Sequence, residues 1–210
     1  MTATAYHHGD LRAALVAVAM ELARPAGAEA IVLREVTRRA GVTPRAAYRH
    51  FADRDDLVRA VAQRALAQLA AAIEHRMAAT REPDGRAMLQ AVGESYIAFA
   101  LDEPGLFDVA FFAMDDMLNT TAPESTSCGT GLSPYQLLEA SLETLVAEGR
   151  LSAGDVGDAV ITCWSGVHGF ATLTARGPLR ELPRELVDQQ STRLVAALVD
   201  AVERRRSRIR

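Results

Sequence analysis

The sequence predicts an all-α protein of about nine helices. From Leu11 to the end of the chain, apolar residues recur at helical spacing, and no segment has the pattern of a strand. The chain is 49% apolar but only 5% aromatic, and its richness in Ala, Leu and Val suits packed helices better than sheets. We therefore expect an N-terminal three-helix domain that contains a helix-turn-helix, followed by a C-terminal helical bundle.

The first helices are marked by their ends. An apolar stripe stops at Pro25 and Gly27, and is formed by Leu11, Leu15, Val18 and Leu22. Val36 and Ala40 then lie one helical turn apart, and Gly41 follows where a glycine ends a helix in the left-handed conformation. Thr43 offers an N-cap oxygen, and Pro44 suits the first position of the next helix.

This next helix has two different faces. Ala47 and Phe51 share one face, whereas Arg45, Tyr48 and Arg49 project elsewhere. The three-residue turn 41–43 has the length found in DNA-binding helix-turn-helix units, whose second helix enters the major groove. The pattern therefore predicts DNA binding. The alternative is an ordinary three-helix bundle with a solvated, arginine-rich helix.

The charge distribution favours the first reading. Residues 1–51 hold seven arginines and four carboxylates, a net charge of +3, whereas the remainder holds 16 arginines and 23 carboxylates, a net charge of −7. A basic N-terminal part on an acidic body is typical of a protein that meets phosphate with that part alone.

The remaining elements follow in order. A fourth helix begins at Asp53, with Asp56 as in a capping box, and runs past Ile73. A turn at 82–85, a helix that breaks at 102–105, and a very apolar segment at 106–118 come next. A polar segment at 119–131 predicts a mobile loop. Three further helices start at Ser133, near a Ser152–Asp155 capping box, and near Pro183. We place the domains at residues 1–52 and 53–210.

Two segments resemble a known family. LREVTRRAGVTPRAAYRHFADRDDLV, with the preceding YHHGDLRAALVAVAMELARPAG, resembles the N-terminal domain of the tetracycline-repressor (TetR) family of bacterial transcription regulators. This resemblance covers about residues 6–66. In one branch of that family the C-terminal domain carries a Trp-x-x-x-His-Gly signature, which is similar to Trp164, His168 and Gly169 in CWSGVHGFATL.

The resemblance and the helix pattern together predict DNA contacts. Arg45 is the best candidate for base readout, because a guanidinium can bond guanine O6 and N7 together. By matching family positions, Thr43, Tyr48, His50 and Arg54 would contact phosphates, and Arg49 would do either. The predicted DNA-binding residues are Arg34, Thr43, Pro44, Arg45, Tyr48, Arg49, His50 and Arg54; His7 and His8 are either further phosphate contacts or part of a flexible end.

One position departs from the family pattern. Family members usually begin the second helix with Ser or Thr, and the corresponding residue here is Val32. Valine cannot accept hydrogen bonds from the N–H groups that open a helix. Arg34 is a possible substitute for the lost phosphate contact.

A pocket for a small apolar or amphipathic effector is predicted in the body. Phenylalanines and methionines are concentrated between residues 96 and 117 in a chain poor in aromatics, and pockets are lined this way. Ordinary core is the alternative for each residue, and His168 is either a ligand contact or a structural histidine. The predicted ligand-binding residues are Tyr96, Phe99, Phe107, Phe111, Phe112, Met114, Met117, Trp164 and His168.

The resemblance further implies a homodimer in which the last two long helices pair with their copies. Their apolar stripes are wide enough for both core and partner, although the alternative is that they form intramolecular core alone. Ser165, Gly166 and Gly169 would let helices approach closely. The predicted interface residues are Val160, Val167, Phe170, Ala171, Leu194, Leu198 and Val202.

Several classes of protein are disfavoured. We expect a cytoplasmic protein without cofactor or metal, because no signal peptide or membrane span is evident, and Cys128 and Cys163 lack metal-ligand or redox spacing. Ser165, His168 and Asp158 suggest a hydrolase only weakly, since no nucleophile elbow accompanies them.

These patterns predict a ligand-responsive regulator, not an enzyme. We expect a repressor that is released from a palindromic double-stranded operator by its effector. The alternative is a helical ligand-binding dimer without DNA function.

Overall fold

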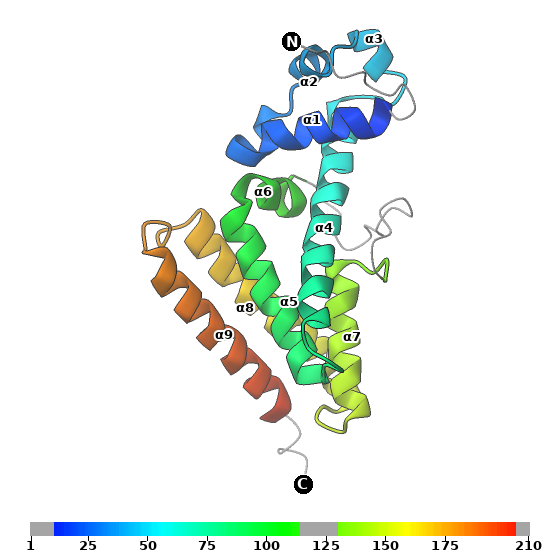
Figure 1. Cartoon of the computed structure of the whole chain (residues 1–210). Coiled ribbons are helices and arrows are strands. Elements are labelled where there is room, and N and C mark those ends of the chain that lie inside the picture. Colours follow the sequence, from blue (N-terminus) through cyan, green and yellow to red (C-terminus); the bar gives the residue numbers. More distant parts are fainter. Residues whose placement is uncertain (1–10, 114–129, 205–210) are drawn as a thin grey trace. The chain divides into compact units, whose positions relative to one another are not determined.

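A computed structural model describes residues 11–113 and 130–204 (Figure 1). Over these residues the chain forms nine α-helices, two 3-10 turns and no strand, which confirms the predicted all-α fold. The elements are α1 (Leu11–Ala26), η1 (Gly27–Ala30), α2 (Leu33–Ala40), α3 (Pro44–Ala47), α4 (Arg54–Ala78), α5 (Gly85–Asp102), α6 (Pro104–Phe112), α7 (Pro134–Ala147), η3 (Ala153–Asp155), α8 (Val156–Ala175) and α9 (Arg184–Arg204).

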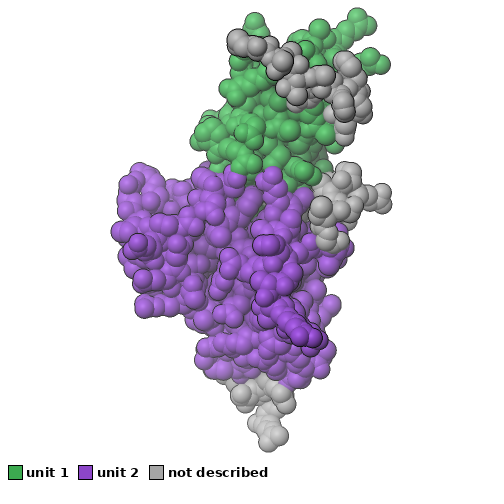
Figure 2. Space-filling view, in the orientation of Figure 1, with its two compact units in different colours: residues 1–65, 105–117 green, residues 66–104, 118–210 purple. Residues whose placement is uncertain are grey.

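Contacts within the chain divide it into two units, coloured separately in Figure 2. The first comprises residues 1–65 and 105–117, and the second comprises residues 66–104 and 118–210. Helix α4 begins in the first unit and ends in the second, and α6 is grouped with the first. The domain boundary that we predict between residues 52 and 53 stays a prediction.

The helix-turn-helix of the first unit is built by the expected local signals. Gly41 ends α2 in the left-handed conformation, with a φ of 69°. The Thr43 hydroxyl accepts a hydrogen bond from the Ala46 N–H at 3.3 Å, and Pro44 occupies the first turn of α3. Backbone hydrogen bonds continue beyond α3 as far as the Phe51 N–H, which donates to the Ala47 carbonyl. Helix α3 and the tightened turn after it, residues 44–51, are called the recognition helix below, because the second helix of such a unit is the one expected to enter the major groove.

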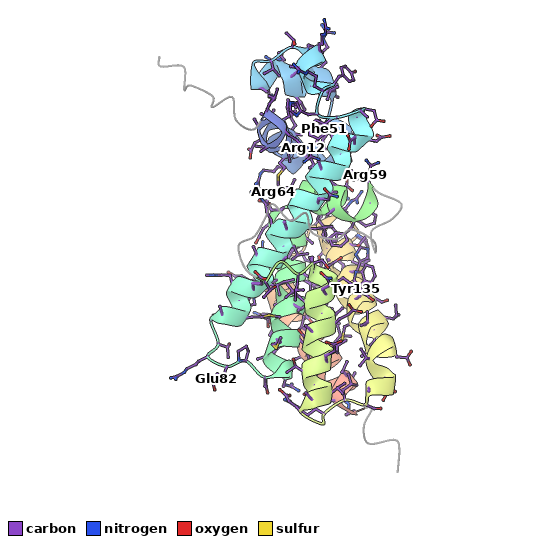
Figure 3. The ribbon with its side chains drawn as sticks, turned by 90° about the vertical axis from the view of Figure 1, so that its right-hand side faces the viewer. Arg12, Phe51, Arg59, Arg64, Glu82 and Tyr135 are labelled. Atoms are coloured by element: carbon purple, nitrogen blue, oxygen red, sulfur yellow. The ribbon has the colours of Figure 1, made fainter. Side chains whose placement is uncertain are left out.

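A small apolar core holds these helices together. Ala47 and Phe51 of the predicted inner face are buried together with Leu15, Val36 and Leu57. The Arg12 guanidinium lies 5.0 Å from the centre of the Phe51 ring, so a cation covers one face of this aromatic side chain (Figure 3).

Helix α6 packs closely on the C-terminal end of α1 within the first unit. A Cβ atom added at Gly105 would lie 2.1 Å from the Ala23 carbonyl oxygen and 2.3 Å from that of Arg24. A Cβ atom at Gly27, whose φ is 70°, would lie 2.4 Å from the Asp108 carboxylate. The backbone contacts at Gly105 leave no room for a side chain, and the left-handed φ of Gly27 favours glycine.

The second unit is a bundle around α5, which packs against α7, α8 and α9. Asp84 caps α5 by accepting from the Ala87 N–H at 2.8 Å, and Ser133 with Gln136 forms a capping box at the start of α7. Close packing is possible because Gly93 of α5 faces Val167 of α8 and Val195 of α9.

The capping box predicted for Ser152 and Asp155 is wrong. The Asp155 N–H donates to the backbone carbonyl of Ser152 at 3.0 Å, which closes the 3-10 turn η3, and neither side chain makes a capping bond. Helix α8 therefore begins one residue after Asp155. At α4 only half of the predicted capping box forms. Asp53 accepts from the Asp56 N–H, whereas the Asp56 carboxylate accepts from the Ala52 N–H instead of the Asp53 N–H.

Three of the sequence predictions fall outside the described residues in whole or in part. These are the loop 119–131, of which only Thr130 and Gly131 are described, the paired histidines His7 and His8, and the ligand-site candidates Met114 and Met117. Glu74 of α4 accepts hydrogen bonds from both the backbone N–H and the hydroxyl of Thr130.

Candidate nucleic-acid interface and ligand site

The recognition helix presents its polar side chains to solvent. Thr43, Pro44, Arg45, Arg49 and His50 are all exposed. Tyr48 is 58% exposed, a large value for an aromatic side chain of this size. Within the described ranges, neither Arg45 nor Arg49 forms a salt bridge with a carboxylate. Two cations and an aromatic ring therefore stand open on one short helix.

The arginines of α2 are arranged differently. Glu35 accepts two hydrogen bonds from Arg38, at 2.8 and 2.6 Å, and one from Arg39 at 2.8 Å. These hydrogen bonds to Arg38, and then to Arg39, lower the pKa of Glu35 to about 2. Arg34 is exposed and, among the described residues, has no carboxylate partner. Arg34 therefore joins Arg45 and Arg49 as an exposed guanidinium without a carboxylate partner among the described residues.

The start of α2 lacks a side-chain cap, as the sequence predicts. Val32 occupies the N-cap position with an extended backbone, makes no side-chain capping bond and is 50% exposed. Its backbone carbonyl accepts from the N–H groups of Glu35 and Val36, at 2.9 and 3.0 Å. A hydrophobic side chain thus stands exposed where a hydroxyl would satisfy a helix N–H group.

Arg54 lies at the first position of α4, and its guanidinium reaches back to the start of α2. The Nε atom donates to the Ile31 carbonyl at 2.9 Å and Nη2 donates to the Ala28 carbonyl at 2.6 Å. The two acceptors lie 23 and 26 residues earlier in the chain. No local sequence signal pairs residues at that separation, so the sequence analysis missed this interaction.

A hydrogen-bonded aromatic cluster lies inside the second unit. The Tyr96 hydroxyl of α5 is 2.8 Å from Nδ1 of His168 of α8. Burial raises the pKa of Tyr96 and lowers the pKa of His168, so both side chains are neutral near pH 7. The bond therefore joins two uncharged groups, and the tautomer of His168 sets which of them donates. The Trp164 side chain also hydrogen-bonds Tyr96, and because an indole N–H only donates, the tyrosine oxygen accepts.

The edge of this cluster extends to α7. The Tyr135 ring meets the Trp164 ring edge-on, with centroids 6.0 Å apart. Trp164 and His168 are each half-buried, and Phe99 of α5 is buried. Tyr135, which the sequence analysis did not single out, is labelled in Figure 3.

The phenylalanines of α6 form a separate group in the first unit. Phe107 is fully buried, and its ring centroid lies 4.8 Å from that of Phe111 and 6.1 Å from that of Phe112. Phe112 is 48% exposed. The predicted ligand residues are therefore distributed over both units, and their assembly into one pocket stays a prediction.

The predicted dimer residues divide by burial within the single chain. Val160, Val167, Ala171 and Val202 are buried in the second unit, whereas Phe170, Leu194 and Leu198 are half-buried. A Cβ atom at Gly166 would lie 2.8 Å from Leu198, so this glycine serves the packing of α8 on α9.

The outer face of α8 carries an apolar stripe that the sequence analysis missed. Ile161 is 62% exposed and Leu173 is 43% exposed. Ser165 and Gly169 lie between them at four-residue spacing, and nothing lies within 4 Å of a Cβ atom added at Gly169. The repeating interval of four residues was the available signal.

Residues 11–113 and 130–204 contain no group of three or more His, Cys, Asp or Glu side chains placed to hold a metal ion. None of the helices described combines the length and the hydropathy that crossing a bilayer requires.

The exposed basic helix on an N-terminal helix-turn-helix, followed by a helical bundle, defines the class of helix-turn-helix regulators. Residues 15–61 match the family described as "Bacterial regulatory proteins, tetR family". Residues 89–202, more than half of the chain, match "Tetracyclin repressor-like, C-terminal domain". The chain belongs to the tetracycline-repressor family of bacterial regulatory proteins.

Solved structures share the fold over nearly the whole chain. A protein of unknown function from Rhodococcus sp. RHA1 is 28% identical, with a TM-score of 0.73, and the match covers 96% of this chain and 100% of that one. A TetR variant from Acinetobacter baumannii AYE, in complex with minocycline, is 19% identical with a TM-score of 0.64, covering 93% and 97%. Among curated protein sequences, no match was found.

Proposed function

We propose that this protein is a dimeric, cytoplasmic transcriptional repressor that binds a palindromic operator and leaves it when a small apolar or amphipathic effector binds the C-terminal domain. The observation that carries the proposal is the open recognition helix, with Arg45, Tyr48 and Arg49 exposed and no carboxylate pairing either arginine within the described chain. Desolvating an arginine that is already paired would cost part of the energy that DNA contact supplies.

The two halves of the proposed interface have different tasks. Arg45 reads a base edge, because it projects from the N-terminal turn of the helix that enters the major groove. Thr43, Tyr48 and His50 contact phosphates and set the register of the helix on DNA. Arg49 and Arg34 contact either a base or a phosphate.

The effector site is proposed around Tyr96, Trp164 and His168. Neutral hydrogen-bonding groups among aromatic rings suit a ligand that is largely apolar and has a few polar atoms. The similar Acinetobacter structure holds minocycline. The phenylalanines of α6, with Met114 and Met117, belong to the first unit and stay candidates for ligand contact. An effector that prefers the conformation unable to span two half-sites shifts the population away from DNA.

The dimer is proposed on α8 and α9. Ile161 and Leu173 are exposed on one face of α8, and the small Ser165 and Gly169 between them allow a second helix to approach. We include Phe170 of α8 and Leu194 and Leu198 of α9, all half-buried, in the proposed interface. A twofold dimer would place two recognition helices on the two halves of a palindrome.

A hydrolytic role for Ser165, His168 and Asp158 is disfavoured by geometry. His168 Nδ1 is bonded to Tyr96, whereas a triad needs it bonded to a carboxylate. Asp158 lies ten residues before His168 on the same helix, which at a rise of ~1.5 Å per residue separates them by about 15 Å.

An electrophoretic mobility shift with the DNA upstream of the protein's own gene tests the proposal. We expect a shifted complex that weakens as salt rises. The matched control is an Arg45→Ala, Arg49→Ala double variant, in which the complex should be lost at the same protein concentration. No complex at low salt with any upstream fragment would refute the repressor function.

A further inference from the structure

The Arg54 side chain donates hydrogen bonds to two backbone carbonyls in the turn that precedes α2. Its Nε and Nη2 atoms donate to the carbonyls of Ile31 and Ala28, while Nη1 lies 3.4 Å from the Asp55 carboxylate. Ala28 lies in the turn η1, and Ile31 connects this turn to Val32, the N-cap of α2. The guanidinium therefore holds the segment that delivers the chain into α2.

That segment is the place where α2 lacks a cap. Val32 follows Ile31 directly and offers no side-chain acceptor to the first N–H groups of the helix. An uncapped helix of eight residues frays easily at its start. By binding two backbone carbonyls that precede Val32, the Arg54 side chain limits that fraying from outside the helix.

We propose that Arg54 is a positioning residue for DNA recognition, which replaces the missing cap of α2 by anchoring the turn before it to the start of α4. The inference rests on the proposed DNA-binding function. Helix α2 packs against α3, so the orientation of α2 sets the orientation of the recognition helix. Arg54 acts on DNA through this chain of contacts, and not through its charge on a phosphate.

The shape of the guanidinium distinguishes the two roles. A planar fork can donate to two carbonyls at once, whereas a lysine ammonium is a flexible point charge that keeps a phosphate contact but not this geometry. The positioning role therefore predicts that Arg54→Lys and Arg54→Gln weaken DNA binding alike. A phosphate role predicts that lysine restores most of the affinity.

The DNA experiment measures operator affinity over a range of salt concentrations for wild type, Arg54→Lys and Arg54→Gln. We expect both variants to lose about tenfold in affinity, the scale of one hydrogen bond to a charged group. We also expect the slope of log affinity against log salt to stay at the wild-type value. A slope lower by about 1 in Arg54→Gln, with recovery in Arg54→Lys, would identify a phosphate contact and overturn the proposal.

A second-site variant tests the link to the missing cap. Val32→Ser supplies the absent acceptor, so it should recover more affinity in the Arg54→Gln background than it gains in wild type. This difference is the coupling that a double-mutant cycle isolates. Equal gains in the two backgrounds would show that the two positions act independently, and would contradict the proposal.

Hydrogen exchange provides a readout without DNA. The buried amides of Val36 and Thr37 should exchange faster in Arg54→Gln and Arg54→Lys, and Val32→Ser should slow them again. Amides of α5 serve as the internal reference, and Arg59→Gln, which removes an exposed arginine paired with Asp56 on the same helix, is the matched control. Unchanged exchange at α2 would overturn the positioning role. Because hydrogen exchange is measured without DNA, it tests the positioning role of Arg54 even if the wild-type protein binds no DNA.

Discussion

At the scale of single residues, the two arginines of the recognition helix differ from Arg38 and Arg39 in having no carboxylate partner among the residues described. Arg38 and Arg39 are held by Glu35, whereas Arg45 and Arg49 extend from α3 and the turn after it. An unpaired, exposed guanidinium gives up only its water when it moves to a base edge, whereas a paired one must also give up its salt bridge. The contribution of each arginine to DNA binding should therefore depend on its existing partner.

We predict that Arg45→Ala weakens operator binding by about 1–3 kcal/mol and relaxes specificity at one base pair in each half-site. Arg38→Ala is the control, because its side chain is already engaged with Glu35, and the loss should be smaller and equal for all sequences. Binding to a library of operator variants measures both quantities. Uniform weakening by Arg45→Ala would identify Arg45 as a phosphate contact instead.

The stability of the protein should depend on pH through His168. Burial lowers the pKa of this side chain below its ordinary value of 6.5, so the unfolded chain takes up the proton at a higher pH than the folded chain does. Stability is therefore full above pH 6.5 and decreases as the pH falls through the unfolded and then the folded pKa.

Melting temperatures at pH 7.5 and pH 5.5 test this expectation. The decrease between the two should be smaller in His168→Asn than in wild type, because the variant has no proton to bind at this position. His75→Asn, which changes an exposed histidine of α4, is the control and should behave as wild type does. Parallel pH profiles for wild type and His168→Asn would contradict the prediction.

At the scale of elements, helix ends followed from local signals, while the contacts between helices did not. Gly41, Thr43 and Asp53 each bond within four residues of themselves, so sequence spacing alone identifies them. The hydroxyl–imidazole bond of Tyr96 and His168 joins residues 72 apart, and no periodicity encodes such a pairing.

The failed capping box at Ser152 shows a limit of local reasoning as well. The motif Ser152-x-x-Asp155 is present, yet the backbone carbonyl of Ser152 takes the Asp155 N–H that the hydroxyl would have bound. Side chain and backbone compete for the same N–H donor, and the geometry of the preceding turn decides which of the two accepts the bond. The outward stripe of α8 was missed for a related reason, since spacing shows that residues share a face but not which face is buried.

We predict that Gly105→Ala lowers the free energy of unfolding by about 1–3 kcal/mol, the usual effect of overpacking. The added Cβ atom would meet two backbone carbonyls of α1, which cannot move as a side-chain tip can. Gly157→Ala is the control, because nothing lies within 4 Å of a Cβ atom there. Chemical denaturation measures the free energy of unfolding of both variants. Equal stability of the two variants would mean that α6 and α1 separate at little cost.

At the scale of the whole molecule, the proposed function requires two copies of the chain. One helix-turn-helix contacts one half-site, and the affinity of a palindrome comes from holding two such units at a fixed spacing. The outer face of α8 offers apolar side chains with small residues between them, and a partner helix would cover both.

We predict that Ile161→Arg shifts the protein from dimer to monomer at micromolar concentration. Burying a large aliphatic side chain contributes roughly 1.5–3 kcal/mol, and a twofold interface loses that contribution twice. Light scattering after size exclusion gives the mass. Leu182→Arg, an exposed leucine outside the helices, is the control and should remain dimeric. A dimeric Ile161→Arg would place the interface elsewhere.

The pairing of Glu35 with two arginines has a kinetic consequence on a chromosome. Every cation that faces phosphate adds to the affinity for DNA of any sequence. Because Glu35 holds Arg38 and Arg39, we expect that general affinity to be low and the protein to dissociate quickly from wrong sites on its way to the proposed operator. Removing the carboxylate would produce a stronger DNA binder that spends more of its time away from its target.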